Sequence, residues 1–308
     1  MHNTIKITAP AKLNLFLHVN ARMTDGYHHI QTLFQPINWL DYLEFSLRKD
    51  KAINLKIRSQ FNDDHRLLRA EDNLVYKAAA LLQGSADIPE GVDIHLTKTI
   101  PVGAGLGGGS ADAATTLYVL NQLWQLNLPL SVLLDFAVQL GADVPALLYR
   151  ASALAEGRGE KLYTIRLPRL WFLVFMPDCH CSTEAVFASQ ELTRDTQIIT
   201  ISDLEAQITG NVRYLSELRN DCQAAAGSIC SAIGELIDKT AHLVADNFSK
   251  PRLTGTGAAV FMMFTFLHQA EAVQRQFLRE YPDHGLLDLR LVESLTERGM
   301  NQITENGV

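Results

Sequence analysis

Hydrophobic and polar residues alternate along several segments of the chain, a pattern typical of strands that bury one face. In residues 91–100 the alternation is strict, so we expect a half-buried strand that runs into a glycine-rich stretch. Residues 4–19 alternate in two parts, and Pro10 between them predicts a strand, a break and a second strand. The remaining expected strands are 41–47 and 52–59, which look like a pair, the apolar run 170–176, and a strand after a second glycine turn within 252–265.

Other segments change to a period of 3.6 residues, which is typical of helices with one buried face. After the glycine-rich stretch such a helix is expected from Ala111 onward, with one face formed by Ala113, Leu117, Leu120 and Trp124. The other expected helices are 73–84, ended by Gly84, 131–141, ended by Gly141, most of 212–241, and 269–281.

Strands and helices mix without a regular βαβ rhythm, which favours an α+β fold. The length of 308 residues suggests about two domains. Polar residues and Pro168 separate two patterned blocks around residues 160–168. We therefore expect an N-terminal domain over 1–163, a C-terminal domain over 164–300, and a frayed tail over 301–308.

The composition argues against several classes of protein. The net charge of −7, from 27 basic and 34 acidic residues, disfavours a nucleic-acid partner. The chain starts without the apolar segment of a secretory signal, and its longest apolar runs are too short to span a membrane. We expect a cytoplasmic protein with no membrane partner and of open oligomeric state. Free thiols, without a metal site, are expected at Cys179, Cys181, Cys222 and Cys230.

Residues 101–110, PVGAGLGGGS, contain five glycines and pose the main question about function. A dinucleotide-binding loop is disfavoured, because residues 117–134 contain no acidic side chain for the ribose. A Walker A loop would need a lysine where Gly109 stands. Two interpretations remain open: an anion site, most naturally for phosphates, at the start of the next helix, or a flexible turn in which Ser110 is the helix cap. In the anion site Ser110 caps the helix or contacts phosphate or metal.

Two charged residues are candidates for chemistry on a phosphate. Lys12 follows the proline break on an otherwise apolar strand, and Asp143 follows a helix stop and precedes Pro145. Phosphoryl transfer needs a cation and a carboxylate near the acceptor hydroxyl. Each residue also has an ordinary interpretation, an exposed lysine and a helix N-cap, and neither decides the matter alone.

Four segments in this order and at these distances resemble the GHMP kinases: PAKLNLFL, PVGAGLGGGSADAA, LGADVP and LTGTGAAVF. Within the family, DGYHHIQTLFQ at 25–35 and EDNL at 71–74 are most similar to the members that act on a cytidyl-linked methylerythritol. The chain departs from the family pattern at Ala111, Thr254 and Thr256, where serines are common.

The resemblance implies a two-domain GHMP fold, with an N-terminal domain like the second domain of ribosomal protein S5, a C-terminal ferredoxin-like domain, and the active site in the cleft between them. It implies that the γ-phosphate of ATP is transferred to the 2-hydroxyl of the cytidyl-linked methylerythritol, in the non-mevalonate route to isoprenoid precursors. Mg²⁺ is expected as a cofactor, held mainly by phosphates and water.

The resemblance also implies roles for single residues. Asp143 matches the catalytic base and Lys12 its partner. The expected ATP contacts are Pro101, Gly103, Ala104, Gly105, Leu106, Gly107, Gly108, Gly109 and Ser110, with Asn73 and Lys98 near the adenosine. The expected substrate contacts are Tyr27, His28 and Phe187 around the cytidine, Asn14 and Thr183 at the polyol or diphosphate, and Gly255 and Thr256 near the acceptor.

Two rival functions stay open at this point. One is another small-molecule kinase of the same fold, acting on mevalonate or homoserine, against which Tyr27 and His28 argue. The other is a nucleotide-binding regulator without catalysis, against which the presence of both Lys12 and Asp143 argues.

Overall fold

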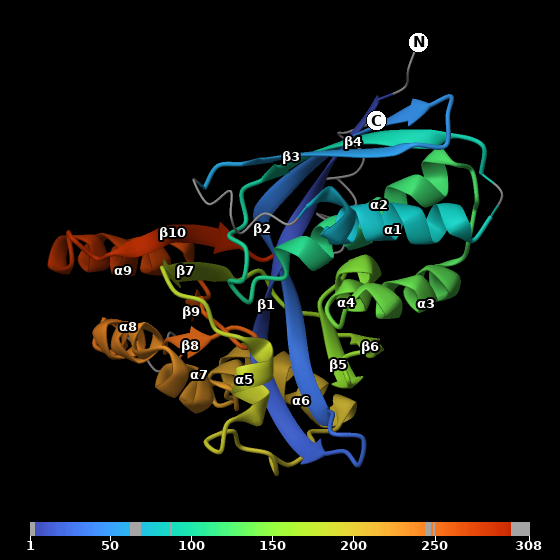
Figure 1. Cartoon of the computed structure of the whole chain (residues 1–308). Coiled ribbons are helices and arrows are strands. Elements are labelled where there is room, and N and C mark those ends of the chain that lie inside the picture. The colour runs from blue at the N-terminus through green and yellow to red at the C-terminus, as the bar shows by residue number, and fades with distance from the viewer. Residues whose placement is uncertain (1–3, 62–68, 87, 244–247, 249, 297–308) are drawn as a thin grey trace.

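Two β-sheets from successive parts of the chain organise the computed structural model, which describes residues 4–61, 69–86, 88–243, 248 and 250–296. In these residues the first sheet contains β1 (Thr4–Arg22), β2 (His28–Arg48), β3 (Ile53–Ser59), β4 (Gly91–Lys98), β5 (Ala153–Gly157) and β6 (Lys161–Thr164). The strand order is β3-β4-β2-β5-β6, and β1 pairs along the other edge of β2. The long β1 and β2 run through the middle of the molecule (Figure 1).

The second sheet is antiparallel and has the order β10-β7-β9-β8. Its strands are β7 (Trp171–Pro177), β8 (Arg252–Leu253), β9 (Val260–Phe264) and β10 (Leu286–Glu293). The chain changes from one sheet to the other between the end of β6 and the start of β7. The domain boundary at 163/164 stays a prediction.

The helices divide between the two sheets in the same way (Figure 1). Those beside the first sheet are α1 (Leu74–Gly84), α2 (Gly108–Leu123), α3 (Leu130–Leu140) and α4 (Val144–Tyr149), preceded by the 3₁₀ helix η2 (Ala70–Asp72). The later ones are α5 (Thr183–Ala188), α6 (Ile201–Gly210), η3 (Val212–Ser216), α7 (Gln223–Ile229), α8 (Ser231–Ala241) and α9 (Leu267–Glu280). No helix of the described ranges is long and apolar enough to cross a bilayer.

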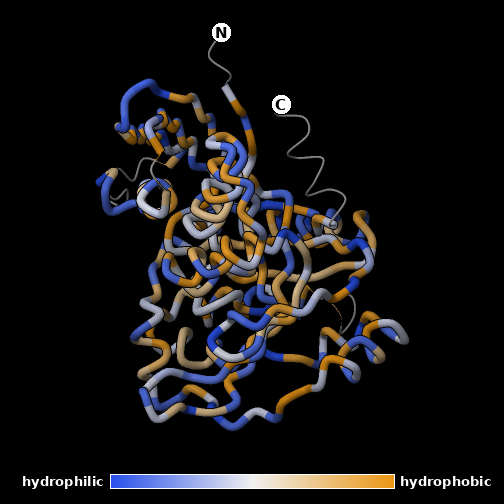
Figure 2. Tube along the Cα trace, turned by 90° about the vertical axis from the view of Figure 1, so that its right-hand side faces the viewer, coloured by the Kyte–Doolittle hydropathy of each residue, from blue (hydrophilic) through white to orange (hydrophobic). Residues whose placement is uncertain are grey.

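Strand β1 belongs to the two larger hydrophobic cores of the described residues. Ile7 and Ala9 pack in a core with α1, α2 and α3. From Ala11 to Val19 the strand packs instead in the larger core with β7, β9 and the later helices. In Figure 2 hydrophobic segments run through the interior of the trace, while many outer loops are hydrophilic. The crossing from one core to the other falls immediately before Lys12.

The expected break at Pro10 is a bulge within one continuous strand, so that prediction was wrong. The register of β1 against β2 shifts between Pro10 and Lys12. Between these two pairs Ala11 alone lies opposite residues 37–39, so the extra residues belong to β2. Such a bulge re-aims the side chains that follow it. Here a lysine in an apolar stretch becomes a buried residue, 3% exposed, rather than an exposed one.

The expected pairing of 41–47 with 52–59 was also wrong, because β4 lies between β2 and β3. Strand β4 is antiparallel to β2 and parallel to β3, with α1 in the connection from β3 to β4. Gly91 allows the insertion: its N–H donates to the carbonyl of Asp50 at 2.5 Å, and a Cβ there would overlap the carbonyl oxygen of Ala52.

The other expected elements are confirmed with shifted ends, and the region 212–241 forms η3, α7 and α8. Helix α2 starts three residues earlier than expected, at Gly108. The sequence did not predict α4, α5, α6, β5, β6, β8 or β10. The tail 301–308 lies outside the described residues.

Candidate active site

Lys12 and Asp143 meet across the fold, although 131 positions separate them in the chain. The Lys12 Nζ lies 3.1 Å from the Asp143 Oδ2. The lysine side chain is 3% exposed, whereas that of the aspartate is 33% exposed. The pair therefore has a buried cationic end and a carboxylate that solvent, or a bound molecule, can reach.

The buried ammonium of Lys12 has two further partners. It donates to the Asn14 Oδ1 at 2.5 Å and to the carbonyl oxygen of Gly105 at 2.9 Å. Asn14 is itself held, since its side-chain amide donates to Thr32 at 2.8 Å and its backbone N–H donates to the hydroxyl of Thr254 at 2.9 Å. A buried charge is tolerated when its donors are satisfied in this way.

Asp143 does not have the ordinary role of a helix N-cap. Its backbone occupies the N-cap position of α4, and Pro145 follows in the first turn. Its side chain accepts no capping hydrogen bond from that helix and points to Lys12 instead. An acidic side chain that gives up capping and stays partly exposed is available for chemistry.

The glycine-rich stretch forms a loop whose backbone only glycine adopts readily. Gly103, Gly105 and Gly107 have φ of +76°, +74° and +71°. Gly107 is the N-cap of α2, without a side-chain cap. Ser110 is the third residue of the helix, so the expectation that it caps α2 was wrong. The first N–H groups of α2 thus belong to glycines, so no side chain covers them. The positive end of the helix dipole lies at the same position.

Different residues of this stretch have different surroundings. Pro101, Ala104, Leu106 and Gly108 are buried. Gly109 is exposed and has an ordinary backbone, and a Cβ there would meet only the Leu74 Cδ1, at 4.0 Å. The folded chain itself therefore does not require glycine at position 109.

The second glycine turn packs backbone to backbone against the first. The Ala259 N–H donates to the carbonyl of Ala104 at 3.0 Å. A Cβ on Gly105 would lie 2.5 Å from the carbonyl oxygen of Thr254. A Cβ on Gly255 would lie 3.5 Å from the Lys12 Nζ. Both turns thus converge on the Lys12 ammonium.

Thr256, in the same turn, extends the site toward the second sheet. Its hydroxyl lies 2.9 Å from that of Thr183, the first residue of α5. His180, in the loop before α5, approaches the first turn, since a Cβ on Gly103 would lie 2.8 Å from its Nδ1. The loop that carries Thr183 therefore adjoins both glycine turns.

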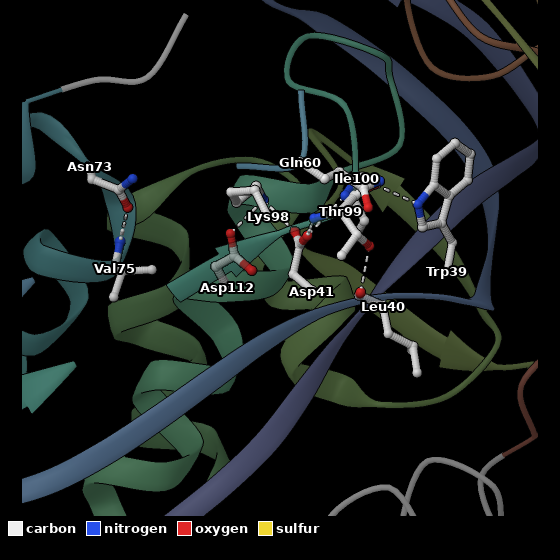
Figure 3. Close-up of polar contacts among 10 residues, drawn as sticks. All are labelled: Trp39, Leu40, Asp41, Gln60, Asn73, Val75, Lys98, Thr99, Ile100 and Asp112. Atoms are coloured by element: carbon white, nitrogen blue, oxygen red, sulfur yellow. Dashed lines mark hydrogen bonds and ion pairs between the residues drawn. The ribbon is translucent and has the colours of Figure 1, made fainter. Parts of the chain in front are cut away.

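Lys98 lies close to the start of α2, because a Cβ on Gly108 would lie 3.2 Å from its Nζ. It forms a buried cluster with two carboxylates (Figure 3). Its Nζ donates to Asp41 and, at 2.6 Å, to the Asp112 Oδ2. The Asp41 Oδ1 also accepts from the backbone N–H groups of Thr99 and Ile100, at 2.5 and 2.9 Å. The ammonium of Lys98 thus pairs with two carboxylates inside the fold and is not open to a ligand.

Burial and the neighbouring charges together set the pKa values of this cluster. Burial, the largest cause, and the neighbouring Asp41 raise the pKa of Asp112 to about 7, although Lys98 acts to lower it. Burial alone would lower the pKa of Lys98, but Asp112 and Asp41 outweigh it and raise that pKa above its ordinary value. The Asp112 Oδ1 is buried without a hydrogen-bond partner. The cluster therefore holds one carboxylate that is fully bonded and one that is not.

Asn73 lies at the N-cap of α1, at the left of Figure 3, where its Oδ1 accepts from the Val75 N–H at 2.9 Å. Its Oδ1 is thus occupied by a structural bond. The position near the adenosine expected for Asn73 and Lys98 stays a prediction.

The expected cytidine residues gather near the turn between β1 and β2. His28 and Phe187 lie side by side, with ring centroids 5.1 Å apart. Tyr27 is 59% exposed, and its ring packs on the guanidinium of Arg158. The Arg158 Cζ lies 4.1 Å from the centroid of the Tyr27 ring. Thus His28, rather than Tyr27, packs on Phe187 in the free protein.

Several residues that build the site were not predicted. Asp41 and Asp112 resemble ordinary polar positions in an alternating strand and a helix. Asn220 donates to the carbonyls of Leu253 and Gly255, both at 2.8 Å, and so fixes the second glycine turn. The only signal was that Asn220 and Asp221 are polar residues within a segment of helical pattern. Among the described residues no group of three or more His, Cys, Asp or Glu side chains could hold a metal ion.

The Asp112 pKa leads to a prediction about pH. Since the folded-state pKa of about 7 is above the unfolded value of 3.8, the folded protein binds the extra proton between these values, and Asp112 lowers stability as the pH rises through this window. Asp112→Asn should therefore gain stability relative to the wild type from about pH 4 to about pH 7, with no further gain above. Urea unfolding at several pH values measures this.

The matched control is Asp41→Asn, which puts an amide nitrogen into a site that accepts from Lys98 and two backbone N–H groups. It should destabilise the protein at every pH of this range. A constant difference between Asp112→Asn and the wild type from pH 4 to pH 7 would contradict the prediction.

Known proteins with similar sequences and structures now identify the family. A family model of the GHMP kinases N terminal domain matches residues 73–151, from the N-cap of α1 past the end of α4. The 4-diphosphocytidyl-2-C-methyl-D-erythritol kinases of Burkholderia thailandensis and Burkholderia multivorans are each 43% identical, over 269 and 277 residues. Each alignment covers 87% of this chain and 88% of the relative.

Solved structures agree with these relatives. The crystal structure of a 4-(cytidine 5'-diphospho)-2C-methyl-D-erythritol kinase superposes with a TM-score of 0.73 at 28% identity, over 94% of this chain and 98% of that one. A homoserine kinase from Cytophaga hutchinsonii has a TM-score of 0.72 at 20% identity, over 96% of both chains, which supports the fold alone. The predicted α+β, two-domain GHMP fold is thus confirmed. With relatives at 43% identity over most of its length, the chain belongs to the GHMP kinases.

Proposed function

We propose that this kinase transfers the γ-phosphate of ATP to the 2-hydroxyl of 4-diphosphocytidyl-2-C-methyl-D-erythritol, in the non-mevalonate route to isoprenoid precursors. The observation that carries the proposal is the Lys12–Asp143 pair, at 3.1 Å, where the two glycine turns and the start of α2 converge. The relatives at 43% identity support the choice of substrate, since they are named for it.

In this proposal Asp143 accepts the proton of the acceptor hydroxyl. Its carboxylate is partly exposed and is held in place by Lys12 rather than by its own helix. The ammonium of Lys12 lies beside the reacting groups and offsets negative charge on the transferring phosphoryl group. The bonds to Asn14 and Gly105 orient that ammonium before any substrate binds.

The phosphates of ATP bind at the glycine-rich loop and the start of α2. The unpaired N–H groups of the first helical turn and the helix dipole favour an anion there. Ser110, in that turn and partly exposed, adds a hydroxyl. In this proposal the adenosine lies near Asn73, at the N-cap of α1, and near Lys98, whose ammonium stays bonded to Asp41 and Asp112 and does not contact it.

Mg²⁺ fits the donors near this loop. Its preferred ligands are oxygens, and it keeps several waters when it is bound with phosphates. The oxygens on offer are the hydroxyl of Ser110 and the carboxylate of Asp143, both partly exposed. When bound, the ion offsets the charge of the phosphates.

The cytidyl substrate binds on the side of α5 in this proposal. Tyr27, His28 and Phe187 contact the cytosine ring. The polyol and diphosphate extend toward Asn14, Thr183 and the second glycine turn, at Gly255 and Thr256. The hydrogen bond between Thr183 and Thr256 supports this path, because it brings α5 and that turn together.

The experiment that tests the proposal measures ADP release with the cytidyl-linked methylerythritol, mevalonate and homoserine. We expect turnover with the first alone. Equal or better turnover with homoserine or mevalonate would contradict the proposed substrate, and no turnover with any of them would favour a non-catalytic regulator.

The first prediction about function concerns the base. Asp143→Asn should lower kcat by about 10²–10⁴, because the amide cannot accept the proton, while the KM for ATP changes little. Lys12→Ala should lower kcat as well, and the double variant should be far less than additive if the two act as a unit. Asp135→Asn, an exposed carboxylate on α3, is the control and should retain full activity. Near-normal turnover of Asp143→Asn would exclude the role of base.

The second prediction concerns the loop. Gly109→Ala should raise the KM for ATP by roughly ten-fold or more, because its methyl group occupies space that the phosphates need. The free protein should be slightly more stable, since alanine favours a helix by about 0.5–1 kcal/mol over glycine. Gly84→Ala, in open space at the end of α1, is the control and should change stability alone. Calorimetry showing normal ATP binding by Gly109→Ala would rule out the phosphate site.

The third prediction concerns the pyrimidine. Tyr27→Ala should raise the KM for the cytidyl substrate by roughly one to two decades through lost stacking, without changing the KM for ATP. The melting temperature should hold, because Tyr27 is 59% exposed. Phe187→Ala should raise the same KM but also lower the melting temperature, since Phe187 packs on the larger core. Tyr42→Ala, 50% exposed on β2, is the control. Parallel changes in both KM values would contradict the stacking role.

A further inference from the structure

Arg194 connects the two segments that carry the proposed cytidine residues. Its guanidinium donates through Nη2 to the carbonyls of Phe187 and Ser189, both at 2.8 Å, and through Nη1 to the carbonyl of Leu192 at 3.1 Å. Its Nε lies 3.2 Å from the Nε2 of His28, at the start of β2. The four contacts fix the guanidinium in one orientation, with the Nε–H directed at the imidazole.

This geometry decides which nitrogen of His28 carries the proton. A guanidinium stays protonated in proteins and has five N–H donors but no acceptor. The Nε–H of Arg194 therefore donates, and the Nε2 of His28 must accept with its lone pair. A neutral imidazole has one donor and one acceptor nitrogen, so the proton of His28 lies on Nδ1.

The charges around His28 also favour the neutral form of its imidazole. The groups that face it are Arg194 and Arg22, both cationic; burial, Arg194 and Arg22, in that order, lower its pKa. Protonation would also place a second N–H against the Nε–H of Arg194. The ring is thus held neutral, with a single donor at Nδ1.

We infer that Arg194 is a positioning residue that fixes His28 as the neutral Nδ1–H tautomer, and that this donor makes the site select cytosine over uracil. The inference rests on the proposed function for the choice of base. Cytosine has an acceptor at N3, whereas uracil has an N–H donor there, so a fixed donor at His28 matches the first and opposes the second. Phe187, held through its carbonyl by the same guanidinium and packed on His28, keeps the imidazole in place.

The tautomer is tested without any substrate. In the free enzyme with ¹⁵N-labelled histidine, the ring signals of His28 should show a protonated Nδ1 and an unprotonated Nε2. Arg194→Leu should allow the proton to occupy either ring nitrogen and should raise the pKa of His28. Arg194→Gln keeps a neutral N–H donor and should preserve the Nδ1–H form. Arg22→Leu is the matched control, since it removes the other nearby charge but no hydrogen bond to the ring. A proton on Nε2 in the wild type, or unchanged signals in Arg194→Leu, would overturn the inference.

Base selection is tested by kinetics with the cytidyl substrate and its uridyl analogue. Arg194→Leu should reduce the preference for the cytidyl substrate about ten-fold, through a higher KM, while kcat and the KM for ATP stay near normal. Arg194→Gln should recover most of the preference, which a merely structural role would not explain. An unchanged preference in Arg194→Leu would overturn base selection. A wild-type enzyme inactive on the cytidyl substrate would instead overturn the proposed function, while the ring signals still decide the tautomer.

Discussion

The buried ammonium of Lys12 is the interaction on which the site depends. It lies where β1 passes from one hydrophobic core to the other, and burial of an unpaired charge there would cost several kcal/mol. Its partners come from three separate segments: Asn14 on the same strand, Gly105 in the first glycine turn, and Asp143 at the start of α4. The fold satisfies the ammonium by bringing these segments together, and the same contacts leave a partly exposed carboxylate beside a fixed cation.

Close approach of bare backbone makes this convergence possible. A Cβ on Gly105 would collide with the Thr254 carbonyl, and a Cβ on Gly107 would lie 3.0 Å from the Lys12 Cε. Glycine thus serves the packing of the folded chain at these two positions. At Gly109 the fold leaves room for a side chain, and in the proposed phosphate site the ligand uses that room.

Two groups of ion pairs adjoin the glycine-rich loop, and they have different roles. The partially exposed Lys12–Asp143 pair faces the site, whereas the buried cluster of Asp41, Lys98 and Asp112 joins β2, the end of β4 and α2 (Figure 3). Lys98 and Lys12 resemble each other in the sequence, as lysines within apolar or alternating strands. Their roles differ because one ammonium is fully enclosed by carboxylates and the other shares its carboxylate with solvent.

The sequence by itself determined the elements and motifs whose signals are local. Alternation predicted β4, the helical period predicted α1, α2 and α3, and the order of the glycine turns around Lys12 and Asp143 indicated the family. These signals are local because backbone preferences and the periods of 2 and 3.6 residues act over a few positions. The bulge at Pro10, the insertion of β4 between β2 and β3, and the hydrogen bond from Arg194 to His28 were decided by the tertiary structure alone. Each depends on partners 24 to 166 positions apart, and neither a residue's type nor its spacing specifies which distant partner shares its hydrogen bonds.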